Sequence, residues 1–150
     1  MLLDTIKSFF ENIFLVEGGG QSEVQGLRLA TAALFIEMSL QDNVEHIDEI
    51  QAIKTGLQQT FSLSDQETSA LYDMARHAVS NATDYHEFTR FIAQHFTQPQ
   101  KIQLVEYLWM IAFADQQLDK YEEHMIRRIA DLIHVSHKDF MQAKHRVMAS

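Results

Sequence analysis

The stretch that decides the fold covers residues 104–140 and reads LVEYLWMIAFADQQLDKYEEHMIRRIADLIHVSHKDF. Its first part is apolar on almost every side and ends at Ala114. An acidic segment follows. After it, apolar residues recur at the spacing of one helix face, at Met125, Ile126, Ile129, Ala130 and Ile133. The stretch therefore predicts a buried helix, an acidic connection and an amphipathic helix.

A weaker copy of this pattern lies in the first half of the chain. Residues 34–38 are apolar apart from Glu37, and an acidic segment follows at residues 42–49. Apolar residues then recur at Ile50, Ile53, Leu57 and Phe61. When Asp42 is aligned with Asp115, Glu49 falls on Glu122, seven residues further on in both copies. We therefore predict two pseudo-repeated halves, each a helix, an acidic hinge and a helix, that face one another.

Helical periodicity accounts for the chain, and no segment alternates with the two-residue period of a strand. The predicted fold class is all-α, a single-domain bundle of about seven to eight helices. An amphipathic helix at residues 1–17 and a glycine-rich joint at 18–22 precede a helical domain at 23–150. The first helix of that domain is expected to start near Ser22. Ser64 and Glu67 form a capping-box pattern that predicts a helix start.

Composition narrows the classes of function. A chain of 150 residues buries roughly 68–70% of its unfolded surface, so it needs no disulfide or structural metal to fold. The absence of cysteine excludes thiol catalysis and cysteine-based metal sites. A formal net charge of −9 argues against nucleic acid, because that binding depends on Lys and Arg contacts with phosphates. Cations or a protein are the expected partners.

The N-terminal apolar segment does not have the pattern of a signal peptide. Asp4, Lys7 and Glu11 interrupt it, and no basic region precedes it. No run reaches the 18 apolar residues of a membrane span, and the acidic polar face of the first helix disfavours a membrane surface. The expected location is the cytoplasm. Whether this helix docks on its own domain or on a partner is left open.

The two acidic hinges supply the candidate metal site. Asp115, Gln117 and Asp119 have the spacing that opens an EF-hand loop, and Ca²⁺ prefers such oxygen ligands. The match then fails, because Lys120 and Ile126 stand where the loop needs Gly and Glu. A cation would therefore need ligands from both hinges. The predicted ligands are Asp42, Glu45, Glu49, Asp115, Asp119 and Glu122.

Stabilisation of helix ends is the alternative explanation of these acids. Asp119 is placed to cap the following helix, and Glu122 to complete its capping box. Capping does not require a further Asp seven residues before the Glu in both copies, so the cation hypothesis stands beside it. Glu37 is expected at the edge of its apolar stripe, within reach of water.

Other titratable residues give no site. The eight histidines lack a supporting ligand set or triad and are expected on the surface. The C-terminal portion is locally basic, and we interpret it as a solvated face that pairs with nearby acids. Its basic residues are Arg127, Arg128, Lys138, Lys144 and Arg146.

The two halves described above resemble the TerB-like (tellurite resistance protein B) family. The resemblance covers residues 27–140 and rests on LWMIAFADQQLDKYEEHMIRRIADLIHVS in the second half and on AALFIEMSLQD and FSLSDQE in the first. Related domains occur at the N-terminus of membrane-anchored DnaJ-like co-chaperones. The resemblance implies an all-helical domain of two pseudo-repeated halves, no established enzymatic activity and an acidic metal-binding surface.

Carried onto this chain, the resemblance places the family's acids at Asp42, Glu49, Asp115, Asp119 and Glu122. The chain departs from the family pattern in the first hinge, where His46 stands in the place of Asp119. Neither hinge has the glycine that the family often places after its Asp. These departures weaken the expected site, above all in the first half.

The leading hypothesis is a non-enzymatic TerB-like binding or scaffold protein, associated with tellurite or stress response, with a weak divalent-cation site. No catalytic residue is predicted, and no cofactor is implied besides a divalent cation, Ca²⁺ or another ion. One alternative is a protein-interaction module that binds without metal, through its acidic surface or N-terminal helix. The other is a hydrolase in which a bound metal activates water. Only the carboxylates support this hypothesis. The oligomeric state is not specified by the sequence.

Overall fold

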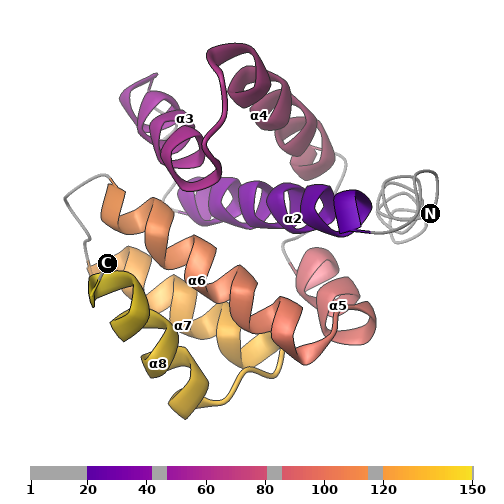
Figure 1. Cartoon of the computed structure of the whole chain (residues 1–150), viewed down its shortest axis with the longest axis vertical. Coiled ribbons are helices and arrows are strands. Elements are labelled where there is room, and N and C mark those ends of the chain that lie inside the picture. The colour runs from indigo at the N-terminus through magenta and orange to yellow at the C-terminus, as the bar shows by residue number, and fades with distance from the viewer. Residues whose placement is uncertain (1–19, 42–46, 81–85, 115–119, 150) are drawn as a thin grey trace.

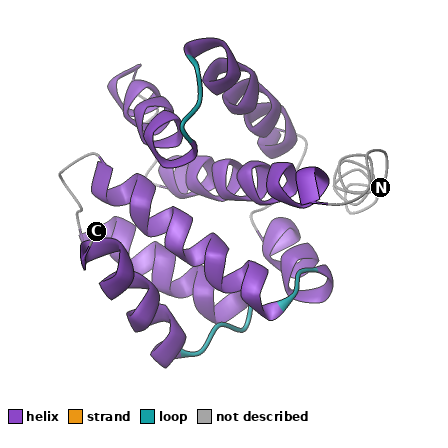
Figure 2. Cartoon of the chain, viewed as in Figure 1, coloured by secondary structure: helices purple, strands orange, loops and turns teal. Residues whose placement is uncertain are grey.

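The computed structural model describes residues 20–41, 47–80, 86–114 and 120–149. Seven helices account for nearly all of them, and these ranges contain no strand (Figure 1; Figure 2). The helices are α2 (Gly20–Gln41), α3 (Ile47–Phe61), α4 (Asp65–Ser80), α5 (His86–His95), α6 (Gln98–Ala114), α7 (Lys120–Leu132) and α8 (His137–Ala149). The prediction of an all-α bundle is confirmed.

The N-terminal part of the prediction is tested only at its edge. α2 begins at Gly20, two residues before the expected start at Ser22, so the last glycine of the expected joint belongs to a helix. The predicted helix at residues 1–17 lies outside the described residues. None of the described helices is long and apolar enough to cross a membrane.

α2 and α6 form the centre of the bundle. Every residue at positions 29–37 of α2 is buried, on all sides of the helix. α6 buries Leu104, Val105, Leu108, Trp109, Ile111 and Ala112. This burial is possible because each helix is surrounded. α2 packs against α3, α4, α5 and α6, and α6 also contacts α3, α7 and α8. The expected central position of α6 is therefore correct, and α2 shares it.

The remaining helices cover the two central ones in two groups. α3 and α4 lie on one side of α2, whereas α7 and α8 pack against α6 (Figure 1). α5 bridges the groups through contacts with α2 and α7. The chain thus repeats one order. A central helix, first α2 and then α6, is followed by two helices that pack against it, α3 and α4 in one group and α7 and α8 in the other.

The turns after α3 and α7 have matching hydrogen bonds. The N–H of Leu63 donates to the carbonyl of Gln58 over 3.1 Å, and that of Val135 to the carbonyl of Ala130 over 2.8 Å. Both are the bond that closes a Schellman motif. Ser62 (φ 55°) and His134 (φ 69°) adopt the left-handed conformation that this motif requires.

The same correspondence continues into the next helix of each group. The Ser64 hydroxyl accepts from the N–H of Glu67 over 3.1 Å, and the Ser136 hydroxyl from the N–H of Asp139 over 3.2 Å. Each serine therefore caps a helix, α4 in one group and α8 in the other. The matching turns and caps agree with two pseudo-repeated halves, and the repeat itself stays a prediction.

Candidate functional site

The predicted metal ligands cluster at two helix connections. Asp42 and Glu45 lie between α2 and α3, and Asp115 and Asp119 between α6 and α7, all outside the described residues. Glu49 and Glu122 lie within α3 and α7, but their side chains are outside the described part of the chain as well. The convergence of these carboxylates therefore stays a prediction.

The helix bounds nevertheless place the acids in matching positions. Asp42 directly follows the last residue of α2, and Asp115 directly follows the last residue of α6. Glu49 is the third residue of α3, and Glu122 is the third residue of α7. The alignment made from the sequence therefore agrees with where the four helices begin and end.

The helices that carry the two hinges are in direct contact. α2 packs against α6, and α3 crosses α6 closely at Gly56. A Cβ atom at Gly56 would lie only 2.8 Å from Cγ2 of Ile111, so glycine is what allows this approach. α2 and α6 also end toward the same side of the molecule (Figure 1). Both hinges therefore start from that side, at Gln41 and Ala114.

Glu37 is the described carboxylate closest in sequence to the first hinge. It lies in α2, one turn before Gln41, and only 7% of it is exposed. The expectation that it lies at the edge of an apolar stripe and reaches water is wrong, because neighbouring helices cover α2 on every side. A buried carboxylate must be compensated by hydrogen bonds or opposite charge, or else be protonated. Glu37 is therefore a further carboxylate to consider beside the first hinge, at the C-terminal end of α2.

Helix capping accounts for part of the second hinge. Asp119 directly precedes α7, and Glu122 occupies its third position, which is the sequence arrangement of a capping box. In the first half, the residue directly before α3 is His46, which is not among the preferred capping residues. Capping of this kind therefore explains the acids of the second hinge better than those of the first.

The capping box at α4 shows how such a carboxylate behaves when it only stabilises a helix. Oε1 of Glu67 accepts from the N–H of Ser64 over 2.9 Å, which confirms the predicted pair. This backbone hydrogen bond, then the Ser64 hydroxyl and the positive charge of Arg28, hold the pKa of Glu67 below its ordinary value. Glu67 is exposed, and its role is structural.

Lys101 and Trp109 each bury a polar group that no sequence pattern indicates. The Lys101 side chain is buried, and its Nζ donates to the carbonyl of Ala93 over 3.0 Å, which satisfies a backbone group near the end of α5. The Trp109 indole is fully buried, and its Nε1 has no acceptor. Nothing in the local sequence distinguishes either from its neighbours, since their roles depend on α5 and α8.

Trp109 sits under a charged bridge between α7 and α8. Nζ of Lys144 lies 5.2 Å from the centre of the indole ring and 2.9 Å from Oε1 of Glu123. Phe113 and Phe140 flank the ring at centroid distances of 5.6 and 5.3 Å. The arrangement ties α6, α7 and α8 together. Across the described ranges, no three His, Asp or Glu side chains gather in a way that could hold a metal ion.

The fold defines a class, an all-helical domain with an acidic connection after each of its two central helices. The chain matches the family model described as tellurite resistance protein TerB over residues 28–145, and it belongs to this family. The match includes both hinges, and it confirms the resemblance inferred from residues 27–140. The relation to DnaJ-like co-chaperones stays a prediction. Comparisons with curated proteins and with solved structures gave no match.

Proposed function

We propose that this chain is a non-enzymatic binding protein of the TerB family whose two acidic hinges hold a divalent cation. The proposed ligands are Asp42, Glu45, Glu49, Asp115, Asp119 and Glu122. An oxygen-only set of this size suits a hard cation such as Ca²⁺, which takes six to eight oxygen ligands. A role as a scaffold in tellurite or stress response is the part of the proposal that rests on family membership.

The observation that carries the proposal is the repeated placement of acids relative to the helices. An aspartate follows α2 and another follows α6, and a glutamate occupies the third position of both α3 and α7. The contact between α2 and α6 joins the helices from which the two hinges depart. Buried Glu37 adds a carboxylate to the same end of α2.

Calorimetric titration with Ca²⁺, Mg²⁺, Mn²⁺ and Zn²⁺ tests the cation site. Asp42→Asn and Asp115→Asn should each weaken binding by roughly tenfold or more, because each removes a charged ligand. Asp73→Asn is the matched control, since Asp73 is exposed on α4 and outside both hinges. Absence of saturable binding, or binding that ignores both hinge variants, contradicts the proposal.

Asp119 separates the cation hypothesis from capping. Asn caps a helix about as well as Asp, whereas Ala does not. If Asp119 binds a cation, Asp119→Asn lowers the affinity while leaving the stability of the metal-free protein unchanged. If it only caps α7, Asp119→Asn is silent in both measurements, and Asp119→Ala alone lowers the stability.

The second candidate function is that of a protein-interaction module that needs no metal. It is favoured by the distribution of exposed charge, since α4 exposes acidic residues and α7 exposes Arg127 and Arg128. Deleting residues 1–20 tests the part of this proposal that concerns the N-terminal segment. A partner that still binds the truncated chain does not use that segment.

A further inference from the structure

Basic side chains gather on α7, although the chain as a whole has a net charge of −9. One exposed stripe of α7, continued into the following turn, consists of His124, Arg127, Arg128, Asp131 and His134. The expectation that the basic residues pair with nearby acids holds only in part. Lys144 pairs with Glu123 and Arg146 with Glu106, whereas Arg127 and Arg128 form no ion pair with any described residue.

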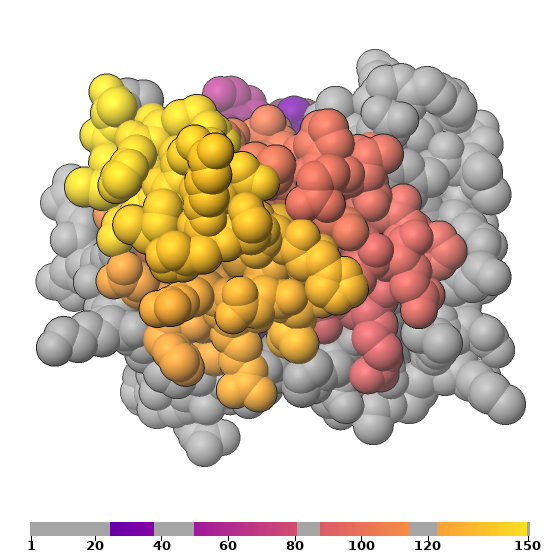
Figure 3. All heavy atoms as spheres, turned by 90° about the horizontal axis from the view of Figure 1, so that it is seen from below, coloured from indigo at the N-terminus to yellow at the C-terminus, as the bar shows by residue number. Residues whose placement is uncertain are grey.

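The neighbouring helix extends this surface. Exposed His137, Lys138, His145 and Arg146 lie on α8, which packs against α7. Figure 3 shows α7 and α8 side by side on one face of the molecule. We call the exposed residues of α7, its following turn and α8 the basic face.

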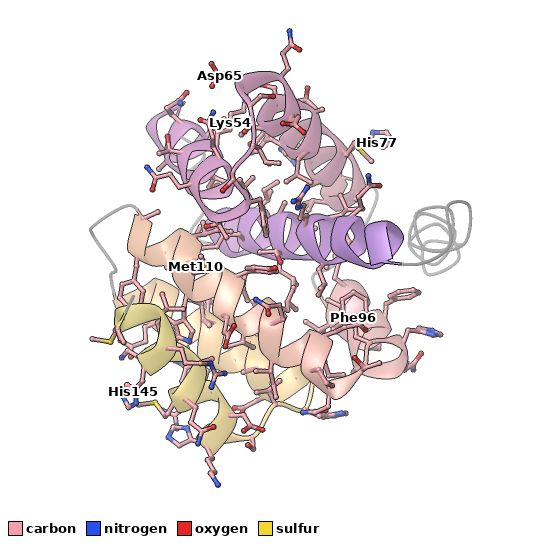
Figure 4. All side chains as sticks on the ribbon, viewed as in Figure 1. Lys54, Asp65, His77, Phe96, Met110 and His145 are labelled. Carbon is pink, nitrogen blue, oxygen red and sulfur yellow. The ribbon has the colours of Figure 1, made fainter. Side chains whose placement is uncertain are left out.

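The opposite end of the molecule carries the opposite charge. The exposed charged side chains of α4 are Asp65, Glu67 and Asp73, and this helix has no exposed Lys or Arg. We call the exposed side of α4 the acidic face. Figure 4 shows Asp65 on one end of the molecule and His145 of α8 on the other. One chain therefore cannot bring its own two faces together.

Each face also exposes one large apolar side chain. Met74 on α4 is 45% exposed and Met148 on α8 is 60% exposed, and they are the exposed large hydrophobic residues of the described chain. Met74 belongs to α4 and Met148 to α8, the helices that carry the two faces. Each face thus combines charges mostly of one sign, with Asp131 the exposed acid within the basic face, and an unbranched side chain that adapts easily to a partner surface.

We propose that the acidic face of one molecule docks on the basic face of a second copy of this chain. A second copy is the favoured occupant because one chain presents both complementary surfaces. The two faces are different, so the contact is heterologous and joins molecules head to tail. An unrelated acidic protein on the basic face is the competing occupant.

The charges predict an unusual dependence on salt. At very low ionic strength the net charge of −9 makes two copies repel one another over a long range. At about 0.15 M salt the screening length is about 8 Å, so this repulsion fades while close contacts persist. At about 1 M salt the close charge contacts weaken as well. Association should therefore be strongest at intermediate salt.

Sedimentation velocity on the full chain tests the proposal. The weight-average mass should rise with protein concentration at about 0.15 M salt, and less at both extremes. Arg127→Glu should reduce the association constant by roughly tenfold, the effect of turning attraction into repulsion at a charged contact. Arg90→Glu is the matched control, because Arg90 is exposed on α5 and the change in charge is the same. Circular dichroism verifies that both variants fold.

A mixing experiment identifies the faces. R127E/R128E alters only the basic face, and D73R/M74R alters only the acidic face, so each should be monomeric alone. Mixed in equal amounts, they should form complexes, since each retains the native face that the other needs. A concentration-independent mass for the wild type at every salt overturns the proposal. It is also overturned if Arg90→Glu reduces association as strongly as Arg127→Glu. Binding of polyglutamate, a stand-in for an unrelated acidic protein, to a chain that stays monomeric overturns it as well.

Discussion

Gly56→Ala should destabilise the protein even though alanine is the better helix former. Gly56 is buried where α3 crosses α6. An added Cβ would lie 2.8 Å from Cγ2, 3.3 Å from the carbonyl oxygen and 3.4 Å from Cα of Ile111. The shortest approach is to Cγ2 of a β-branched side chain that is stiff at χ1, and the carbonyl oxygen is also close. Ile111 must therefore leave its preferred rotamer or α6 must shift.

The expected magnitude follows from two opposing terms. Alanine in place of glycine within a helix gains about 1 kcal/mol. Forcing an extra methyl group into a packed interior costs about 1–3 kcal/mol. The net result is a loss of about 1 kcal/mol in the free energy of unfolding, or about 2–4 °C in Tm for a chain of this size.

Urea unfolding followed by tryptophan fluorescence measures this loss. Trp109 is the single tryptophan of the chain and is buried in α6, so it reports on the helix that Gly56 contacts. Gln59→Ala is the control within the same helix, because Gln59 is exposed, and it should change stability by less than about 0.5 kcal/mol.

A double variant shows whether the crowding is the cause. Ile111→Leu moves the branch away from Cβ and so removes the Cγ2 contact. Combined with Gly56→Ala, it should cost at least about 0.5 kcal/mol less than the sum of the two single changes. Strict additivity, or a Gly56→Ala protein as stable as the wild type, would refute the reasoning.

The remaining predictions concern single contacts. Ser64→Ala removes the hydroxyl that accepts from the N–H of Glu67, and urea unfolding should show a loss of about 1 kcal/mol. The pKa of Glu67 is lowered in the folded state. Ionised Glu67 therefore stabilises the folded state fully above the ordinary glutamate pKa of about 4.3, and this stabilisation is lost as the pH falls through the lowered pKa. Glu67→Gln should flatten the dependence of the unfolding free energy on pH in this acid range. Lys101→Met leaves the carbonyl of Ala93 without its donor and should cost about 1–3 kcal/mol in thermal or urea unfolding.

Local signals in the sequence were sufficient to predict the described helices and much of the core. Periodicity located the apolar stripes, and the apolar character of residues 104–114 on nearly all sides correctly placed α6 at the centre. The Ser64 and Glu67 pattern predicted a capping box because both partners lie within one turn of helix. These features depend on neighbours in sequence, which is why they could be found without coordinates.

Features that depend on distant elements could not be predicted in this way. Glu37 was expected to reach water, but helices far away in the sequence cover α2. Lys101 is buried because α5 ends beside it, and no local pattern marks that encounter. Lys144 and Arg146 of α8 find acidic partners on α7 and α6, whereas Arg127 and Arg128 find none among the described residues. For the candidate site, helix bounds agree with the alignment of the hinges. Whether the carboxylates of the two hinges bind one cation is tested by the titrations.

The left-handed residues that close α3 and α7 have a practical consequence for engineering. Ser62 and His134 carry side chains in a conformation that costs an L-residue roughly 1–2 kcal/mol and glycine almost nothing. Part of that gain is offset because glycine is freer in the unfolded chain, by roughly 0.5–1 kcal/mol. Ser62→Gly and His134→Gly should therefore each raise the melting temperature slightly. Because neither position belongs to a hinge, a sturdier protein made this way would keep every proposed cation ligand.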